Sequence, residues 1–135
     1  MRFHLLALPN APVHPDYSLD GFAVATHRFS RMMMSLGHTV ILYGAEGSDA
    51  SVCTEFVQVV SERERRALLE RAPSNNCEYQ HVVMDESRSL WQRTNPAMAA
   101  EVALRKQPKD FLLTIGGASQ RTVFEFNPDL MPCEY

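Results

Sequence analysis

The chain opens with an apolar run, a polar loop and an amphipathic segment. Residues 3–8 are almost continuously apolar without helical spacing, which is typical of a strand buried on both faces of a parallel sheet. Asp20 is a candidate cap for a helix that ends at Gly37. The β-branched run 39–43 predicts a second strand, so a right-handed βαβ unit is expected. The predicted apolar face of the helix consists of Phe22, Ala25, Phe29, Met32, Met33 and Leu36.

The middle of the chain predicts a strand and a charged helix. Residues 55–60 alternate enough for a strand, and Ser61 with Glu64 forms a capping box at the start of a largely solvent-exposed helix that runs to about residue 71. The following segments are predicted to be a loop, a short strand and a turn, at residues 72–77, 79–84 and 85–87.

The last third predicts one more helix and one more central strand. Asn95 can cap a helix and Pro96 suits its first position, so we expect a helix from there to about Lys106. Residues 110–115 predict a buried strand. A glycine pair, the cap of a short helix and the end of that helix are expected after it, at Gly116-Gly117, Ser119 and Asn127-Pro128.

This order of elements predicts an α/β fold, a three-layer Rossmann-like domain with a mostly parallel sheet over residues 1–135. Hydrophobic residues make up 45% of the chain and charged residues 21%, which suits a globular domain with a core. Residues 133–135 follow what looks like the start of one more element. We therefore expect the chain to be the first half of a larger protein.

Composition argues against several classes of protein, namely nucleic-acid binders, metal-binding proteins and membrane-spanning proteins. The formal net charge of -3 gives no signature of a dedicated nucleic-acid binder. The three cysteines, Cys53, Cys77 and Cys133, lie far apart without CxxC spacing, which favours reduced thiols and gives no zinc or other metal site. The apolar start is too short for a membrane span and breaks at Pro9, so a cytoplasmic protein is expected.

Candidate chemistry lies where the predicted strands end, because ligands of open parallel sheets bind beyond the carboxyl ends of the strands. The loop after the first strand carries polar residues near a helix start, where backbone N–H groups can hold an anion or a sugar hydroxyl. A surface loop without a ligand is the alternative interpretation, and the loop lacks a GxGxxG fingerprint. The candidate residues of this loop are Asn10, His14, Tyr17, Ser18, Asp20 and Gly21.

His14 is the candidate general base, as the loop's one histidine, although a histidine in a loop can equally be a plain exposed side chain. Glu46 follows the second strand, where a carboxylate can bind ribose hydroxyls or only form a turn. Gly116 and Gly117 allow a ligand or another backbone segment to approach closely, or form a tight turn, and Gln120 can point into the same crevice. No cofactor-binding motif is present.

Two stretches of the chain resemble a known family. The run 5–9, the step from Met33 through Gly37-His38 to Val40, and the strand end 43–46 are similar to the opening of retaining, glycogen-synthase-like GT-B glycosyltransferases. A later set looks like the end of the same amino-terminal domain in a phage and bacterial branch of that group: Trp91, Asn95, Glu101, Gln107-Pro108, Asp110-Phe111-Leu112, Gly116-Gly117 and Gln120.

The resemblance implies the acceptor-side half of a two-domain hexosyltransferase. The donor half, which binds the nucleotide-sugar in this family, would be a second domain, and the isolated chain would be inactive because transfer needs donor and acceptor held together. The acceptor is not identified. Two other hypotheses remain: a stand-alone Rossmann-like nucleotide-binding protein, and a non-catalytic module that docks on a carboxy-terminal domain or forms a homodimer.

Overall fold

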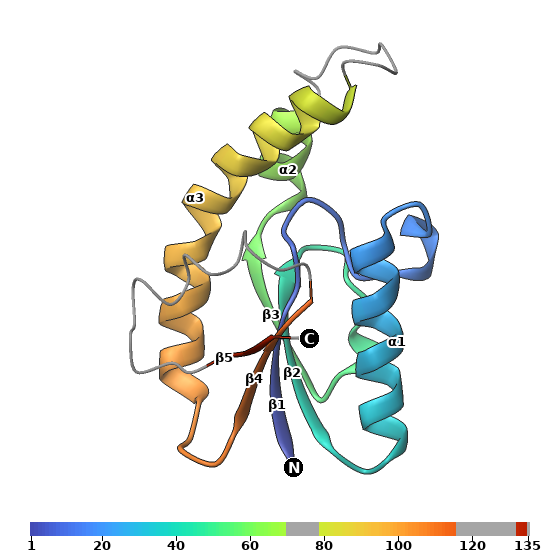
Figure 1. Cartoon of the computed structure of the whole chain (residues 1–135), viewed down its shortest axis with the longest axis vertical. Coiled ribbons are helices and arrows are strands. Elements are labelled where there is room, and N and C mark those ends of the chain that lie inside the picture. Colours follow the sequence, from blue (N-terminus) through green and yellow to red (C-terminus); the bar gives the residue numbers. More distant parts are fainter. Residues whose placement is uncertain (70–78, 116–131, 135) are drawn as a thin grey trace.

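A computed structural model describes residues 1–69, 79–115 and 132–134. Its sheet has five strands in the order β3-β2-β1-β4-β5, and every neighbouring pair is parallel. This confirms the predicted α/β, Rossmann-like fold (Figure 1). The strands are β1 (Arg2–Leu6), β2 (Thr39–Ala45), β3 (Glu55–Val60), β4 (Phe111–Thr114) and β5 (Pro132–Glu134).

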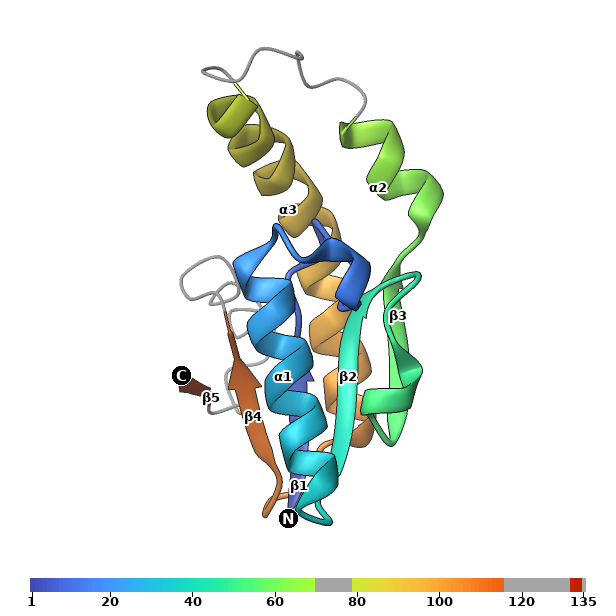
Figure 2. The ribbon, with the colours of Figure 1, turned by 90° about the vertical axis from the view of Figure 1, so that its right-hand side faces the viewer.

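Helices cover both faces of the sheet. Figures 1 and 2 show α1 (Gly21–Ser35) on one face and α3 (Tyr79–Arg105) on the other, with α2 (Glu62–Leu69) beside the upper part of α3. Two short 3-10 helices complete the described elements, η1 (Pro15–Tyr17) and η2 (Ala50–Val52). The predicted three-layer arrangement is therefore present in the described part of the chain.

The core is divided between the two faces by strand alternation. Leu5 and Leu42 are fully buried and belong to the cluster beneath α1, together with the half-buried Phe29. Leu6 and Tyr43, one residue later in each strand, belong to the cluster beneath α3. Both faces of the central strands are buried, which explains why the sequence of β1 shows a continuous apolar run instead of alternation.

The structure corrects the prediction for residues 79–96. The predicted strand at 79–84, the turn at 85–87 and the helix start at Asn95 are all wrong, because one 27-residue helix, α3, runs from Tyr79 to Arg105 with Pro96 inside it. Proline in a helix interior costs roughly 3 kcal/mol. Burial of one stripe of α3 against the sheet offsets that cost, and the stripe includes Leu90, Met98, Ala99 and Val102.

Helix α1 begins where expected but is rotated about its axis relative to the prediction. Asp20 is its N-cap, and Gly37 after its end has a positive φ of 83°. Phe22 and Met32 are about half exposed, whereas the small residues Ala23, Thr26 and Ser30 are buried. The hydroxyl of Ser30 donates to the backbone carbonyl of Val52 in η2, so a polar residue occupies a buried position of α1 that periodicity assigned to larger apolar residues.

A buried polar chain links the three central strands, from the middle of β1 to the second half of β2 and the residue before β4. His4 is fully buried in β1, with its Nδ1 2.8 Å from the Tyr43 hydroxyl of β2 and its Nε2 2.8 Å from Oδ2 of Asp110, which directly precedes β4. Asp110 also accepts from the backbone N–H of Gln107 and lies 3.5 Å from Arg2. This cluster is hereafter the His4 network.

The pKa shifts indicate which side chains of the His4 network carry a proton at neutral pH. Burial lowers the pKa of His4, although Asp110 opposes this, and burial raises the pKa of Tyr43. Burial opposes ionisation of Asp110, but its hydrogen bonds to Gln107 and His4 outweigh burial and lower its pKa. A neutral His4 therefore donates from Nε2 to an ionised Asp110 and accepts at Nδ1 from the Tyr43 hydroxyl.

Replacing Tyr43 with Phe should destabilise the protein by about 1–3 kcal/mol, because Nδ1 of His4 would be left buried without a donor. Urea denaturation followed by circular dichroism measures the change. The matched control is Tyr17→Phe, which removes only a long 3.4 Å hydrogen bond and should cost less than about 1 kcal/mol. A loss below about 0.5 kcal/mol for Tyr43→Phe would contradict a stabilising role for this hydroxyl.

The His4 network should also make stability depend on pH. Since the folded-state pKa of His4 lies below its ordinary value of 6.5, the unfolded chain binds the proton first, and the free energy of unfolding should fall as pH drops below 6.5. Asp110, whose pKa is lowered from 3.8, should add a second loss below that pH. His4→Gln should reduce the slope between pH 6.5 and 5 in urea titrations. Equal slopes for wild type and His4→Gln would refute the assignment.

Candidate functional site

The strand order places a topological switch point between β1 and β4. Chain connections reverse direction there, and in open parallel sheets ligands bind outside the carboxyl ends of the strands at such a point. In the described part of the chain, the loop that follows β1 lies on one side of this point. The predicted residues of the other side, Gly116, Gly117 and Gln120, lie outside the described residues, so their roles stay predictions.

Asn10 and Asp20 form a hydrogen-bonded pair in the β1–α1 loop. Oδ1 of Asp20 accepts from the backbone N–H groups of Phe22 and Ala23, both at 3.0 Å, which satisfies free donors at the start of α1. Its Oδ2 accepts from Nδ2 of Asn10 at 3.2 Å. This leaves the amide oxygen of Asn10 buried and without a hydrogen-bond donor among the described residues. Gly21 is the first residue of α1, and a Cβ there would meet nothing within 4 Å.

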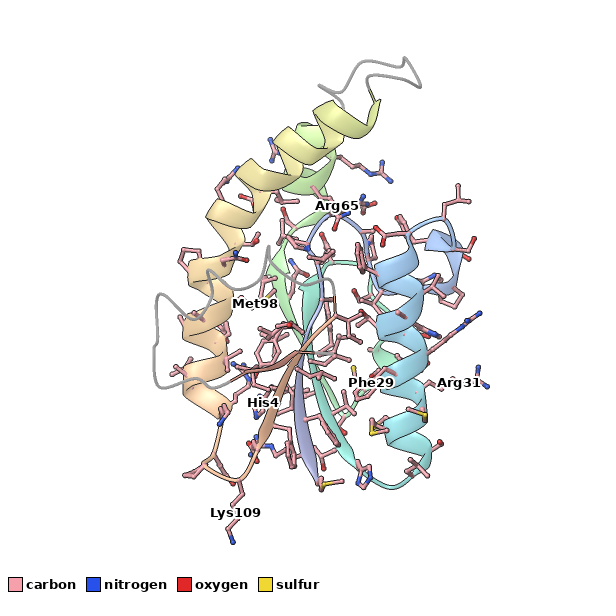
Figure 3. All side chains as sticks on the ribbon, in the orientation of Figure 1. His4, Phe29, Arg31, Arg65, Met98 and Lys109 are labelled. Atoms are coloured by element: carbon pink, nitrogen blue, oxygen red, sulfur yellow. The ribbon has the colours of Figure 1, made fainter. Side chains whose placement is uncertain are left out.

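Arg65 of α2 reaches the same loop and was missed from sequence (Figure 3). It is only 5% exposed, its guanidinium lies 5.5 Å from the centroid of the Tyr17 ring, and its Nη2 donates to the Tyr17 hydroxyl at 3.4 Å. Glu62 is 4.0 Å away, the limit of an ion pair. Nε of Arg65 is buried without a hydrogen-bond acceptor among the described residues.

The burial of Arg65 corrects the prediction of a solvent-exposed helix. Its neighbours Arg63, Glu64 and Arg66 are exposed as expected, but Arg65 is not. A signal was present in the sequence, because Arg65 lies three and four residues before Leu68 and Leu69, on the side of the helix where its apolar residues fall. The charge that Arg65 shares with its neighbours predicts an exposed side chain, whereas its position on the helix places it with the apolar residues.

Glu46 follows β2 as predicted, but its carboxylate contacts the start of α2. Oε2 of Glu46 accepts from the backbone N–H of Glu62 at 2.7 Å, and the Glu46 N–H donates to the carbonyl of Val60. Ser61 adds half of the predicted capping box, since its hydroxyl accepts from the Glu64 N–H at 3.1 Å. These contacts position α2, and with it Arg65, relative to the end of β2.

His14 and Ser18 belong to a different part of the surface. His14 caps η1, its Nδ1 accepting from the backbone N–H of Asp16, and both His14 and Ser18 line a hollow beside α1. The structure therefore separates the predicted loop residues into two groups. Tyr17 contacts Arg65 and Asn10 is hydrogen-bonded to Asp20, whereas His14 and Ser18 take part in neither contact.

The described residues also bear on other classes of site. Within them, no group of three or more His, Cys, Asp or Glu side chains could hold a metal ion, and no helix is long and apolar enough to cross a membrane. Cys53 is a free, buried thiol, and burial raises its pKa to about 11, so it is a poor nucleophile at neutral pH.

Comparisons of the chain with protein-family models, curated proteins and solved structures gave no match. Inference about function therefore rests on the fold, on the side chains at the carboxyl edge of the sheet and on the sequence resemblance.

Replacing Asp20 with Ala should cost about 1–2 kcal/mol of stability, because α1 loses its cap and the Asn10 amide loses its acceptor. Asp20→Asn should retain most of that stability, since asparagine caps helices equally well, and Asp16→Ala, at an exposed position, should change it little. Thermal and urea unfolding compare the three variants. If Asp20→Asn were as unstable as Asp20→Ala, the negative charge, not the cap, would be what the fold requires.

Proposed function

We propose that this chain is the acceptor-side domain of a sugar-nucleotide-dependent glycosyltransferase, and that the acceptor binds at the carboxyl edge of its sheet. The reaction class comes from the sequence resemblance. The observation that carries the binding site is the pair of unsatisfied buried groups in the loop after β1 and in α2, the Asn10 amide oxygen and Nε of Arg65.

The chemistry of this pair favours a hydroxyl-bearing ligand. Asn10 offers an acceptor, and this assignment follows from the hydrogen bond that its Nδ2 gives to Asp20. Arg65 offers a donor. A sugar hydroxyl both donates and accepts, so hydroxyl groups can satisfy both atoms, whereas a fully ionised phosphate can satisfy only the arginine. Polar groups left buried without partners cost about 1–3 kcal/mol, which a bound ligand would recover.

The second candidate function is a stand-alone nucleotide-binding protein. Arg65 is the observation that favours it, because a buried guanidinium is well suited to a phosphate. The two candidates differ in the group that Arg65 binds, a sugar hydroxyl or a phosphate, because the ribose of a nucleotide also carries hydroxyls that can donate to Asn10. A docking module without a ligand, the third hypothesis, predicts self-association instead of binding.

A single titration series distinguishes these functions. The ¹⁵N-labelled chain is titrated with methyl α-D-glucopyranoside, maltose, uridine monophosphate and UDP-glucose, and nucleotide release from UDP-glucose is assayed in parallel. We expect a sugar to shift the amide resonances of residues 9–21 and 62–66, and we expect no nucleotide release, since transfer needs both halves of a closed site.

Two variants locate the binding. Arg65→Gln should weaken the response to sugar by roughly tenfold, as expected for loss of a charge-assisted hydrogen bond. The matched control, Arg63→Gln, removes the same charge from an exposed position of the same helix and should leave the response unchanged. Uridine monophosphate binding without any sugar response would favour the nucleotide-binding function. Oligomers in light scattering with no ligand response would favour the docking module, and sugar transfer by the isolated chain would refute our proposal.

A further inference from the structure

A hollow of about 280 Å³ lies between η1 and α1, apart from the carboxyl-edge site. Its volume is close to the lower end of the range for small-molecule sites, about 300–1,000 Å³. Most of its surface is apolar, and four of the seven lining residues are basic, including the exposed Arg28 and Arg31. The side chains that matter are His14, Ser18, Val24, His27, Arg28 and Arg31.

The basic side chains come from one stripe of α1. His27, Arg28 and Arg31 lie three, four and seven residues after Val24, so they share one side of the helix. Figure 3 shows Arg31 extending from α1 away from the sheet, whereas Arg65 lies above the sheet near the loop after β1. Ser18, just after η1, also lines the hollow and is its one residue with a hydroxyl.

Positive charge in the hollow is not balanced by its own lining. No carboxylate lines it, and neither Arg28 nor Arg31 forms an ion pair within residues 1–69, 79–115 and 132–134. The two nearby acids accompany the histidines: Oδ2 of Asp49 is 3.0 Å from Nε2 of His27, and Oδ2 of Asp16 is 3.5 Å from Nδ1 of His14. Two guanidinium groups therefore remain available for an anion.

The position of His27 is fixed by its acidic partner. Asp49 accepts from both the hydroxyl and the backbone N–H of Ser51 and contacts His27, and these hydrogen bonds lower the pKa of Asp49 to about 2. An ionised Asp49 thus anchors the imidazole between η2 and α1. The wall of the hollow formed by His27 is consequently ordered before any ligand binds, which lowers the entropic cost of binding.

We propose that this hollow binds the phosphate group of a small phosphorylated molecule, with Arg28 and Arg31 as its ligands. Guanidinium groups bind phosphate oxygens with paired, charge-assisted hydrogen bonds, and the Ser18 hydroxyl can donate a further one. Val24 provides apolar surface for the remainder of the molecule. A nucleic-acid polymer fits less well, because the chain carries a net charge of -3 and these cations are confined to one small hollow.

Calorimetry and NMR on the full chain test the proposal at constant ionic strength, with inorganic phosphate, glycerol 3-phosphate, glycerol and a 20-base-pair DNA duplex as probes. We expect both phosphates to bind and glycerol not to bind, with resonance shifts centred on residues 14–18 and 24–31. The variant Arg28→Gln/Arg31→Gln should weaken glycerol 3-phosphate binding at least about tenfold.

The matched control is Arg63→Gln/Lys109→Gln, which removes the same two charges from exposed positions elsewhere and should change affinity by less than about twofold. Both double variants should keep the circular dichroism spectrum and melting temperature of the wild type. Equal weakening by the two would show a general charge effect and overturn the site. Tight DNA binding without phosphate binding, or no binding of either phosphate, would also overturn it. Arg65→Gln should not affect phosphate binding in this hollow. A failure of the phosphate proposal can therefore be distinguished from a failure of the proposed function.

Discussion

The His4 network is the constraint on which the centre of the sheet depends. Three parallel strands that are separate in sequence are linked through His4, Tyr43 and Asp110. Such a chain of buried polar groups is favourable only when each member has its partner, because an unpaired member loses its hydration without compensation. A strand shifted by one residue would move His4 or Tyr43 to the other face and leave the remaining groups unsatisfied. The network thus favours one register among strands whose apolar side chains would tolerate several.

The network and the candidate site differ in how their polar groups are satisfied. Within the described residues, each polar group of the network is paired, and Tyr43 and His4 are fully buried. At the carboxyl edge, Asn10 and Arg65 each keep an unsatisfied buried atom. Polar groups that are satisfied internally stabilise a fold, whereas those that are not can be completed by a ligand. This difference in satisfaction, not the residue types, distinguishes the structural cluster from the candidate site.

Much of the fold could be predicted because periodicity and caps are local signals. The apolar run of β1, the Asp20 cap, Gly37 after α1 and the strand Glu55–Val60 all follow from a few neighbouring residues. The prediction of α3 was wrong because the local signals in its sequence conflict. Asn95-Pro96 resembles a helix start, and only packing against the sheet keeps the helix continuous through that point. The predicted buried face of α1 was wrong for a related reason. Small residues such as Ser30 are buried where α1 packs, whereas the larger Phe22 is half exposed.

By itself, the sequence determined the class of the fold, the first βαβ unit and the loop where polar groups gather, because strand and helix periodicity depend on residues close along the chain. Only the tertiary structure decided which of those groups act together. It buried Arg65 against Tyr17, joined Asn10 to Asp20, placed His14 in a separate hollow and used Glu46 to position α2. These outcomes depend on how α1 and α2 pack around the ends of the strands, and contacts between distant segments leave no periodic trace in the sequence.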